Sequence, residues 1–231
     1  MYTLDIVIPA YNEAESIGET LKGIEDHAPF GTRVSVVVDS WEDSTIEAVR
    51  KTPTTSLQVR YLVQRPFNGP ANAIKYGLQQ ATAPYAIIMM GDGSDDPETL
   101  SPMLSLLESG VAIACASRYM AGGRQLGGPW LKGRISKGAG FAFHYITGVG
   151  TLDATNCFKG FSRDFLSEIE IESDTGFEIG IELLAKGVRM RRRVEEVPTI
   201  WRDRKQGESR FQLFKWLPLY SKWFIYGVRK S

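Results

Sequence analysis

Three aspartates that follow an apolar run near the middle of the chain carry the clearest chemical signal in the sequence. The run Tyr85–Met90 shows no alternation of polar and apolar residues, which is typical of a fully buried strand. Asp92, Asp95 and Asp96 come directly after it. Carboxylates this close together repel one another unless a cation or a polar partner holds them. Mg²⁺ and Mn²⁺ favour carboxylate oxygens and often carry substrate phosphates, so the stretch indicates a metal and phosphate site.

The same aspartates also fit the start of a helix. Asp95 or Asp96 would serve as the N-cap, with Pro97 at the first helical position. The two interpretations are compatible, and the local pattern leaves both open.

The first half of the chain alternates between strand-like and helix-like segments. We expect strands at Leu4–Pro9, Arg33–Asp39, Leu57–Val63, Tyr85–Met90 and Val111–Ser117, and helices at Asn12–His27, Ser44–Lys51, Pro70–Ala81 and Pro97–Ser109. Such alternation predicts an α/β fold in which a mostly parallel sheet is flanked by helices. The aspartates would then lie at the carboxyl edge of the sheet, where open α/β sheets bind ligands.

The pattern changes after Ser117. The stretch Arg118–Trp130 is glycine-rich and reads as a loop, and helical spacing returns at Leu131–Gly148 and Gly176–Gly187. Val188–Pro198 is strand-like, with arginines on both faces. No linker or repeat interrupts the chain, so we expect a single domain.

Composition excludes several classes of protein. The 231 residues carry a formal net charge of +0, which gives no field that would favour nucleic acid. Cys115 and Cys157 have no metal-ligand spacing and form no disulfide framework, which fits a reducing compartment. The chain enters a strand within a few residues of its start, and no apolar run reaches the roughly 18 residues that span a bilayer. We therefore expect a cytoplasmic protein.

The last residues, 211–231, form an aromatic and basic segment with amphipathic character. Such a segment can lie in a membrane interface, which would make the protein peripheral on the inner face of the membrane. It can equally be a helix that packs on the core.

Four segments occur in an order that resembles a known enzyme family. They are Ile6–Glu13 (IVIPAYNE), Val36–Asp43 (VVVDSWED), Asp92–Asp96 (DGSDD), and the late pair Glu196–Pro198 (EVP) and Arg204–Arg210 (RKQGESR). Together they resemble the family 2 glycosyltransferases of the GT-A fold, most of all the polyprenyl- or dolichyl-phosphate mannose or glucose synthase branch. The resemblance implies a GT-A domain at 1–210, with a nucleotide-sugar-binding half at 1–117, an acceptor half at 118–210 and a C-terminal segment at 211–231.

The resemblance implies a GDP- or UDP-sugar donor lying across the ends of the first strands. Pro9, Ala10, Tyr11 and Glu13 match positions that line the base and ribose pocket, and Asp39 would meet the base or the ribose. Carboxylates hydrogen-bond well to hydroxyl and N–H groups. Asp92 and Asp95 match the acids that hold Mg²⁺ or Mn²⁺ and the donor diphosphate, and Asp92 counts as a donor residue as well.

Two departures from the family pattern concern these acids. Many relatives carry paired aspartates after the second strand, where this chain has Val38 and Asp39. Counting back from the proline after the fourth strand places Gly91 and Gly93 at the two usual aspartate positions. One inserted residue restores Asp92 as the first acid and leaves Ser94 or Asp95 as the second.

Basic and hydroxyl side chains match the family's phosphate-binding positions. Arg118 matches an arginine after the fifth strand that takes part in catalysis, and Arg204 and Ser209 match the late loop over the site. Lys132, Arg134 and Ser136 match a segment that binds the acceptor phosphate, although Lys132 stands where relatives have an arginine. Asp153–Lys159 resembles the floor of the acceptor site.

The implied reaction is an inverting, in-line displacement at the anomeric carbon. A polyprenyl phosphate is already anionic and needs positioning but no general base, and the basic residues favour this acceptor. A saccharide or other hydroxyl acceptor would need a base such as Asp153 or Glu182. A non-catalytic nucleotide-sugar-binding protein is the third possibility, because Val38 replaces one usual acid and glycines, Gly91 and Gly93, stand at two others.

Overall fold

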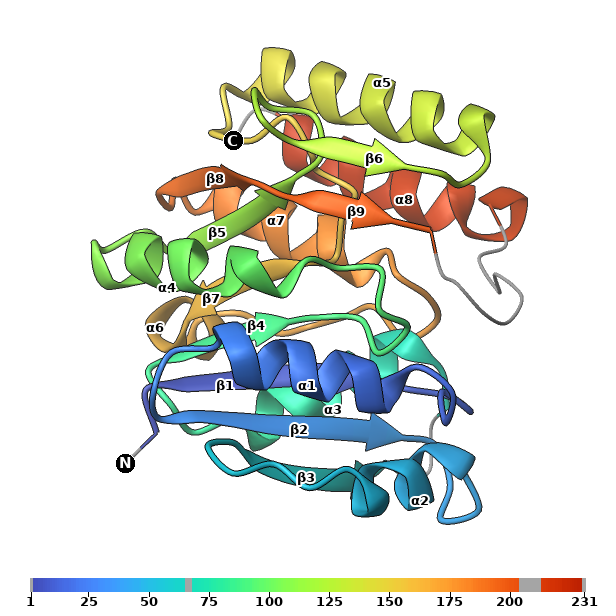
Figure 1. Ribbon diagram of the computed structural model, residues 1–231. Coiled ribbons are helices and arrows are strands. Elements are labelled where there is room, and N and C mark those ends of the chain that lie inside the picture. The colour runs from blue at the N-terminus through green and yellow to red at the C-terminus, as the bar shows by residue number, and fades with distance from the viewer. Residues whose placement is uncertain (1, 65–67, 204–212, 230–231) are drawn as a thin grey trace.

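Seven strands form the central sheet of the protein (Figure 1). The computed structural model describes residues 2–64, 68–203 and 213–229, with the side chains of 213–215 left out. In chain order the strands are β1 Leu4–Pro9, β2 Thr32–Val38, β3 Gln58–Val63, β4 Tyr85–Ile88, β5 Ile113–Ser117, β7 Lys159–Ser162 and β8 Val194–Pro198. Their order across the sheet is β3-β2-β1-β4-β7-β5-β8.

All pairings in this sheet are parallel except those of β7, which runs antiparallel between β4 and β5. The sequence did not predict this strand, because Lys159–Ser162 is short and contains a glycine in place of an alternating pattern. Two further strands, β6 Arg124–Leu126 and β9 Ile200–Arg202, pair with each other beside the main sheet.

Helices cover both faces of the sheet. They are α1 Ile17–His27, α2 Ser44–Lys51, α3 Pro70–Gln80, α4 Leu100–Glu108, α5 Trp130–Thr147, α6 Arg163–Ser167, α7 Ile179–Arg189 and α8 Leu213–Val228, with a 3₁₀ turn, η1, at Pro97–Thr99. β2 is buried along its whole length, because its valines pack alternately against α1 on one face and α3 on the other. The α/β fold with a mostly parallel sheet is therefore confirmed.

Element boundaries differ most from the sequence expectation at two places. The helix predicted at Asn12–His27 begins at Ile17, because Asn12 has a left-handed backbone with φ of 54° and the chain turns there. The strand predicted at Val188–Pro198 is wrong in its first half. α7 continues to Arg189, and β8 begins at Val194, the first apolar residue after the arginine run.

The C-terminal helix α8 packs on the domain. Figure 1 shows it lying between α5 and α7. Trp223 is buried, and the Nζ atom of Lys186 on α7 lies 5.1 Å from the centre of its ring. The rings of Phe224 and of Phe143 on α5 are in contact, with 5.4 Å between their centres. The core-packing interpretation of this segment therefore holds for its described residues. None of the helices in the described part of the chain combines the length and apolar character needed to cross a membrane.

Candidate active site

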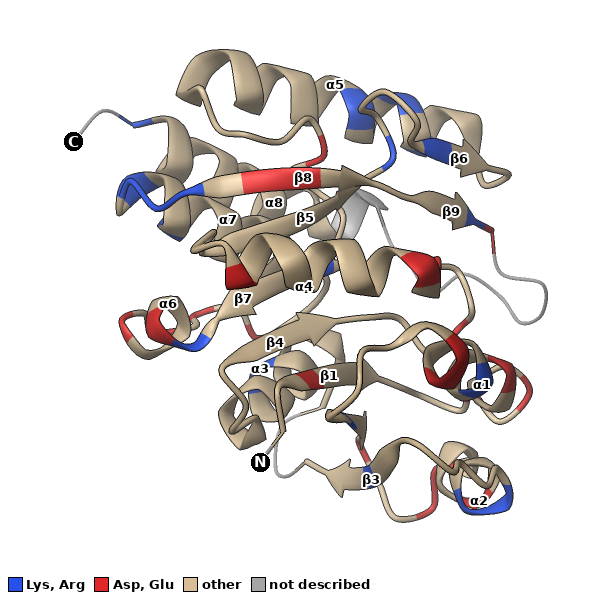
Figure 2. Ribbon diagram, turned by 60° about the vertical axis from the view of Figure 1, so that its left-hand side comes forward, with Lys and Arg blue, Asp and Glu red and all other residues tan. Residues whose placement is uncertain are grey.

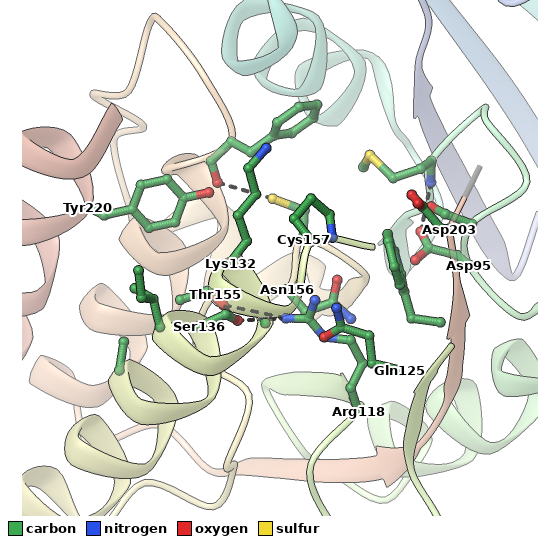
Figure 3. Close-up of a pocket in the computed structure, with 18 of the residues that line it drawn as sticks. Asp95, Arg118, Gln125, Lys132, Ser136, Thr155, Asn156, Cys157, Asp203 and Tyr220 are labelled. Carbon is green, nitrogen blue, oxygen red and sulfur yellow. Dashed lines mark hydrogen bonds between the residues drawn. The ribbon is translucent and has the colours of Figure 1, made fainter. Parts of the chain in front are cut away.

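Two cavities open at the carboxyl edge of the sheet. The edge cavity is lined by Pro9, Ala10, Tyr11, Glu13, Asp39, Asn68, Gly69, Pro70, Ala73, Phe177 and Trp216. The central cavity is lined by Arg118 and by residues of the acidic stretch, of α5, of the segment 155–157 and of α8 (Figure 3). The strands that lead to them, β1 and β4, are direct neighbours in the sheet.

The edge cavity gathers five residues that the resemblance assigns to donor binding. Pro9, Ala10, Tyr11, Glu13 and Asp39 all line it. The carboxylate of Asp39 accepts hydrogen bonds from Gln64 Nε2 at 2.6 Å and from the backbone N–H of Gly69 at 3.1 Å. These bonds hold the carboxylate at the wall of the cavity.

The turn after β1 positions Tyr11 and Glu13. Asn12 lies between them, and its backbone N–H donates to both carboxylate oxygens of Asp43 at 3.1 Å. Asp43 also caps α2, because its Oδ1 accepts from the backbone N–H of Thr45 at 2.8 Å. One aspartate thus joins the start of α2 to the loop that lines the edge cavity.

The acidic stretch divides its three aspartates between two roles. Asp92 and Asp95 line the central cavity. Asp96 instead caps the 3₁₀ turn η1 and accepts a hydrogen bond from Glu98 N at 3.3 Å. Gly93 has a φ of 73°, a conformation that suits glycine, and it lets the chain turn between the two cavity-lining aspartates.

Asp95 is a buried acid with a perturbed pKa. Its Oδ2 accepts a hydrogen bond from the backbone N–H of Met90 at 2.9 Å, and only 5% of the residue is exposed. Burial raises the pKa of Asp95 to about 7, and the charge of Asp92 adds to the rise against the opposing bond from Met90. A positive charge beside the two carboxylates would offset this cost.

Arg118 lies at the base of the central cavity and is fixed by Asp153. Its Nε and Nη2 donate to Asp153 Oδ2 and Oδ1 at 2.7 and 2.9 Å. The Asp153 side chain is fully buried. Burial alone would raise the pKa of Asp153, but the charge and hydrogen bonds of Arg118 bring it below its usual value. Arg118 is therefore a permanently charged, oriented group.

Hydroxyl groups extend this arrangement along the cavity wall. Arg118 Nη2 donates to Ser136 Oγ at 3.0 Å, and Ser136 Oγ lies 2.6 Å from Thr155 Oγ1. Figure 3 shows these three side chains converging on one side of the cavity, with Lys132 above them. Cationic and hydroxyl donors in this arrangement suit a phosphate group.

The structure does not bring every predicted residue to this cavity. Arg134 is exposed on α5, with its guanidinium 5.6 Å from the centre of the Trp130 ring. It is not among the described residues that line the central cavity. The register of α5 explains this, because Lys132 and Ser136 are i,i+4 and share a face that Arg134 does not. Arg204 and Ser209 lie outside the described residues.

A family model described as Glycosyl transferase family 2 matches residues 5–170 of this chain. The chain belongs to glycosyl transferase family 2. The match covers six of the seven strands of the main sheet, leaving out β8. It also covers the acidic stretch and Asp153, which fixes Arg118.

Curated relatives of this glycosyltransferase point to one branch of the family. The chain is 27% identical to polyprenol monophosphomannose synthase of Mycolicibacterium smegmatis, over 89% of its own length and 79% of the relative. It is 28% identical to dolichol-phosphate mannosyltransferase of Pyrococcus furiosus, over 90% of this chain and 59% of that protein. It is 26% identical to undecaprenyl-phosphate mannosyltransferase of Micrococcus luteus, over 88% and 85% of the two chains. The similarity to the polyprenyl-phosphate mannose synthase branch, which the motifs indicated, is therefore confirmed.

Solved structures establish the GT-A fold. Glucosyl-3-phosphoglycerate synthase from Mycobacterium tuberculosis, in complex with phosphoglyceric acid, aligns over 100% of this chain and 82% of its own, with a TM-score of 0.69 and 16% identity. The mannosyltransferase PcManGT from Pyrobaculum calidifontis, in complex with GDP-Man and Mn²⁺, aligns over 89% of this chain and 58% of its own, with a TM-score of 0.62 and 18% identity.

The acidic stretch of this glycosyltransferase fits a divalent metal in its chemistry. Asp92, Asp95 and Asp203 line the same cavity, and Figure 3 shows Asp203 beside Asp95. Carboxylate oxygens suit Mg²⁺ and Mn²⁺. In the part of the chain that the structure describes, no three acidic, histidine or cysteine side chains converge closely enough to hold an ion. Phosphate oxygens of a bound diphosphate would have to complete its coordination, as is common for Mg²⁺.

Sequence reasoning missed several residues that line the central cavity, Asp203 above all. This residue follows β9, whose Arg202 N–H donates to Ser94 O at 2.9 Å, so the end of β9 is joined to the acidic stretch. Asp203 directly precedes the late basic motif, which was the available signal. Tyr220 and Leu217 of α8 also line the central cavity, although the amphipathic pattern of residues 211–231 gives no sign that this segment reaches the site.

Proposed function

We propose that this glycosyltransferase moves a hexose from a nucleotide sugar to a polyprenyl phosphate, with inversion and with help from Mg²⁺ or Mn²⁺. The observation that carries the proposal is the composition of the central cavity. Acids that suit a metal–diphosphate and donors that suit a second phosphate line one space, which adjoins the edge cavity. Two phosphate sites on either side of a transferred sugar are what this reaction needs.

The donor is a GDP- or UDP-sugar whose nucleoside occupies the edge cavity. Asp39 supplies an acceptor for base or ribose groups there, and the strands that lead to the two cavities, β1 and β4, are neighbours in the sheet. PcManGT was crystallised with GDP-Man and Mn²⁺, and glucosyl-3-phosphoglycerate synthase with UDP-glucose and Mn²⁺. Both nucleotides therefore belong in the screen.

The acceptor is a polyprenyl phosphate, the class of lipid in the names of three curated relatives. Its phosphate would lie against Arg118, Ser136 and Lys132. Apolar side chains line the same cavity on the side of α5 and α8, among them Ile135, Ala139 and Leu217. Their position supports a path by which the prenyl chain leaves the site between these helices.

The chain's own residues position the nucleophile. Arg118 and Ser136 hold the acceptor phosphate so that one of its oxygens faces the anomeric carbon, where the new carbon–oxygen bond forms as the bond to the donor diphosphate breaks. Asp92 and Asp95 would hold the metal, with Asp203 close by. When bound, the metal supplies positive charge for the leaving diphosphate. No residue has to remove a proton, because the acceptor oxygen is already anionic.

A hydroxyl acceptor finds less support. Asp153, one candidate base, is paired with Arg118. Glu182, the other, is fully buried, accepts from the N–H groups of Glu172 and Ser173 at 2.7 and 2.8 Å, and pairs with Lys186 at 2.8 Å. Both acids thus hold structure in place, and neither lines the edge cavity or the central cavity as the described residues form them.

We also propose peripheral contact with the inner face of a membrane, through α5. Its outer side exposes Trp130, Leu131, Ile135, Tyr145 and Ile146, with Tyr145 exposed to 78%. Figure 2 shows basic residues gathered on α5 and β6, on the same side of the molecule. Apolar side chains interleaved with Arg134 and Lys137 suit an anionic lipid surface, from which the acceptor would enter the cavity below.

A donor and acceptor screen tests the function. Purified protein with Mn²⁺ or Mg²⁺ is offered GDP-mannose, GDP-glucose, UDP-glucose and UDP-galactose, each with undecaprenyl phosphate or with a saccharide acceptor. We expect one donor to give a labelled product that extracts into organic solvent. A product formed only on the saccharide would contradict the lipid acceptor, and a lack of donor binding in the presence of metal would contradict catalysis.

A further inference from the structure

An aromatic pair stands where the two cavities meet. Phe177, just before α7, lines both the edge cavity and the central cavity. Its ring contacts the indole of Trp216 edge to face, with 5.7 Å between ring centres and 77° between planes. Trp216 lines the edge cavity, and the next residue of α8, Leu217, lines the central one. The pair is therefore the boundary between the two spaces.

The protein holds this pair in a fixed place. A Cβ added at Gly176 would lie 2.7 Å from the Trp216 ring, so only glycine lets the indole sit so close to the backbone. The backbone N–H groups of Thr175 and Gly176, the two residues before Phe177, donate to the carboxylate of Glu178 at 3.3 and 2.8 Å. Glu178 is itself almost fully buried. These contacts hold Phe177 and Trp216 in place more firmly than an aromatic pair with only a packing role requires.

The position of the aromatic pair determines which part of a bound nucleotide sugar it can contact. A donor with its nucleoside at Asp39 and its diphosphate at Asp92 extends from the edge cavity into the central one. Its anomeric carbon must face the acceptor phosphate at Arg118 and Ser136, so its hexose lies at the boundary. The polar partners for a base are Asp39 and Gly69, which line the edge cavity and not the central one.

We propose that Phe177 and Trp216 contact the hexose being transferred, with the aromatic rings packing on its apolar C–H face. This inference rests on the proposed function and adds the residues that determine the sugar. The C–H face that a hexose presents depends on which hydroxyls are axial, so a fixed pair of rings distinguishes one hexose from its epimers. The rings also exclude water from the side of the anomeric carbon on which they lie.

Binding of matched ligands tests the role of the pair. Titration calorimetry with Mn²⁺ compares GDP-mannose with GDP, and UDP-glucose with UDP, on the full chain. For the nucleotide sugar that binds, we expect Trp216→Leu to weaken affinity about tenfold while the affinity for the matching nucleoside diphosphate changes less than about twofold. Trp216→Phe, which keeps a ring, should recover most of the loss.

Trp223→Leu is the matched control, because Trp223 is on the same helix, is equally buried and lines neither cavity. An equal loss for nucleotide sugar and nucleoside diphosphate in Trp216→Leu, or no loss for either, would overturn the role of the pair. A wild-type chain that binds neither nucleotide sugar would overturn the proposed function and this inference together.

A measurement on the wild-type chain covers the case in which Trp216→Leu does not fold. The protein is labelled with 5-fluorotryptophan, and the Trp216 fluorine resonance is assigned by its loss in Trp216→Phe. We expect GDP-mannose or UDP-glucose to shift this resonance and the matching nucleoside diphosphate to leave it in place. The same shift with both ligands, or no shift with either, would overturn the proposal.

Discussion

Arg118 and Asp153 are joined by two parallel hydrogen bonds, at 2.7 and 2.9 Å, in a fork whose carboxylate is fully buried. The same guanidinium donates to Ser136 at 3.0 Å. Arg118 follows β5 and Ser136 belongs to α5, so Asp153 aligns two elements that would otherwise vary in their distance from each other. Asp153 is by this geometry a positioning residue for the acceptor phosphate.

Asp153→Asn should therefore raise the KM for polyprenyl phosphate, by about 10- to 100-fold, with little change in the KM for the donor. The change keeps the size of the side chain but removes its charge and leaves the guanidinium of Arg118, mostly covered by the protein, without its counter-ion. Steady-state kinetics with each substrate varied in turn measures the split. The variant should also lose about 3–5 kcal/mol of unfolding free energy.

Asp5→Asn is the control for this loss of stability. Asp5 of β1 pairs with Arg33 of β2 through bonds of 2.7 and 2.9 Å, is equally buried and lines neither cavity. It should lower stability by a similar amount and leave both KM values unchanged. Equal changes in the two KM values of Asp153→Asn would argue that Asp153 serves stability alone.

The acidic stretch allows a matched pair of substitutions. Asp92→Asn should lower kcat by about a thousandfold or more, because it removes a carboxylate from the proposed metal–diphosphate site. Asp96→Asn should cost at most about 1 kcal/mol of stability and leave kcat near the wild-type value, because an asparagine also caps η1. Product formation at saturating Mn²⁺ distinguishes them, and a fully active Asp92→Asn would remove the metal assignment.

The raised pKa of Asp95 predicts how stability depends on pH. Its pKa is about 7 in the folded state against an ordinary value of 3.8. The folded state therefore binds more protons than the unfolded state between these values, so stability falls as pH rises from about 4 to about 7. The penalty is fully present above pH 7.

Thermal unfolding with a chelator, from pH 4.5 to 8, measures this effect as the difference between the wild-type protein and Asp95→Asn. The wild-type chain should lose stability relative to the variant as pH rises, and Mn²⁺ with a nucleoside diphosphate should restore it at pH 8. A difference that stays flat across the range would show that Asp95 does not titrate there.

Vesicle flotation tests the membrane contact. The double substitution Tyr145→Ser with Ile146→Ser should reduce binding to vesicles of phosphatidylcholine and phosphatidylglycerol about tenfold, since two exposed apolar side chains are lost. Trp41→Ser, which removes another exposed aromatic from the loop after β2, should not. Equal flotation of all three proteins would contradict a contact through α5.

The first half of the fold could be predicted because its strands and helices repeat regular patterns. Five strands and four helices follow from the runs and the spacing of apolar residues in this half of the chain. β7 could not be found this way, because its four residues, KGFS, form no apolar run like that of β4, and its place in the sheet depends on β4 and β5. Local sequence carries no information about such a distant pairing.

The candidate site was predictable to the extent that motifs carried it. Pro9, Tyr11, Asp39, Asp92 and Arg118 line the cavities that the resemblance implied. The role of Asp153 was not predictable, because an aspartate with a buried partner looks the same in sequence as one in an open site. Phe177 and Trp216 are 39 positions apart in the chain and meet only because α8 packs beside α7.

β7 has a consequence for how the chain is made. Residues 159–162 fill the gap between β4 and β5, so a nascent chain that ends before them presents two unpaired strand edges in the middle of its future sheet. Such edges are templates for pairing with another chain. The first five strands must therefore wait for some forty further residues after β5 to leave the ribosome before the sheet can close, and this interval is when the protein is most exposed to misassembly.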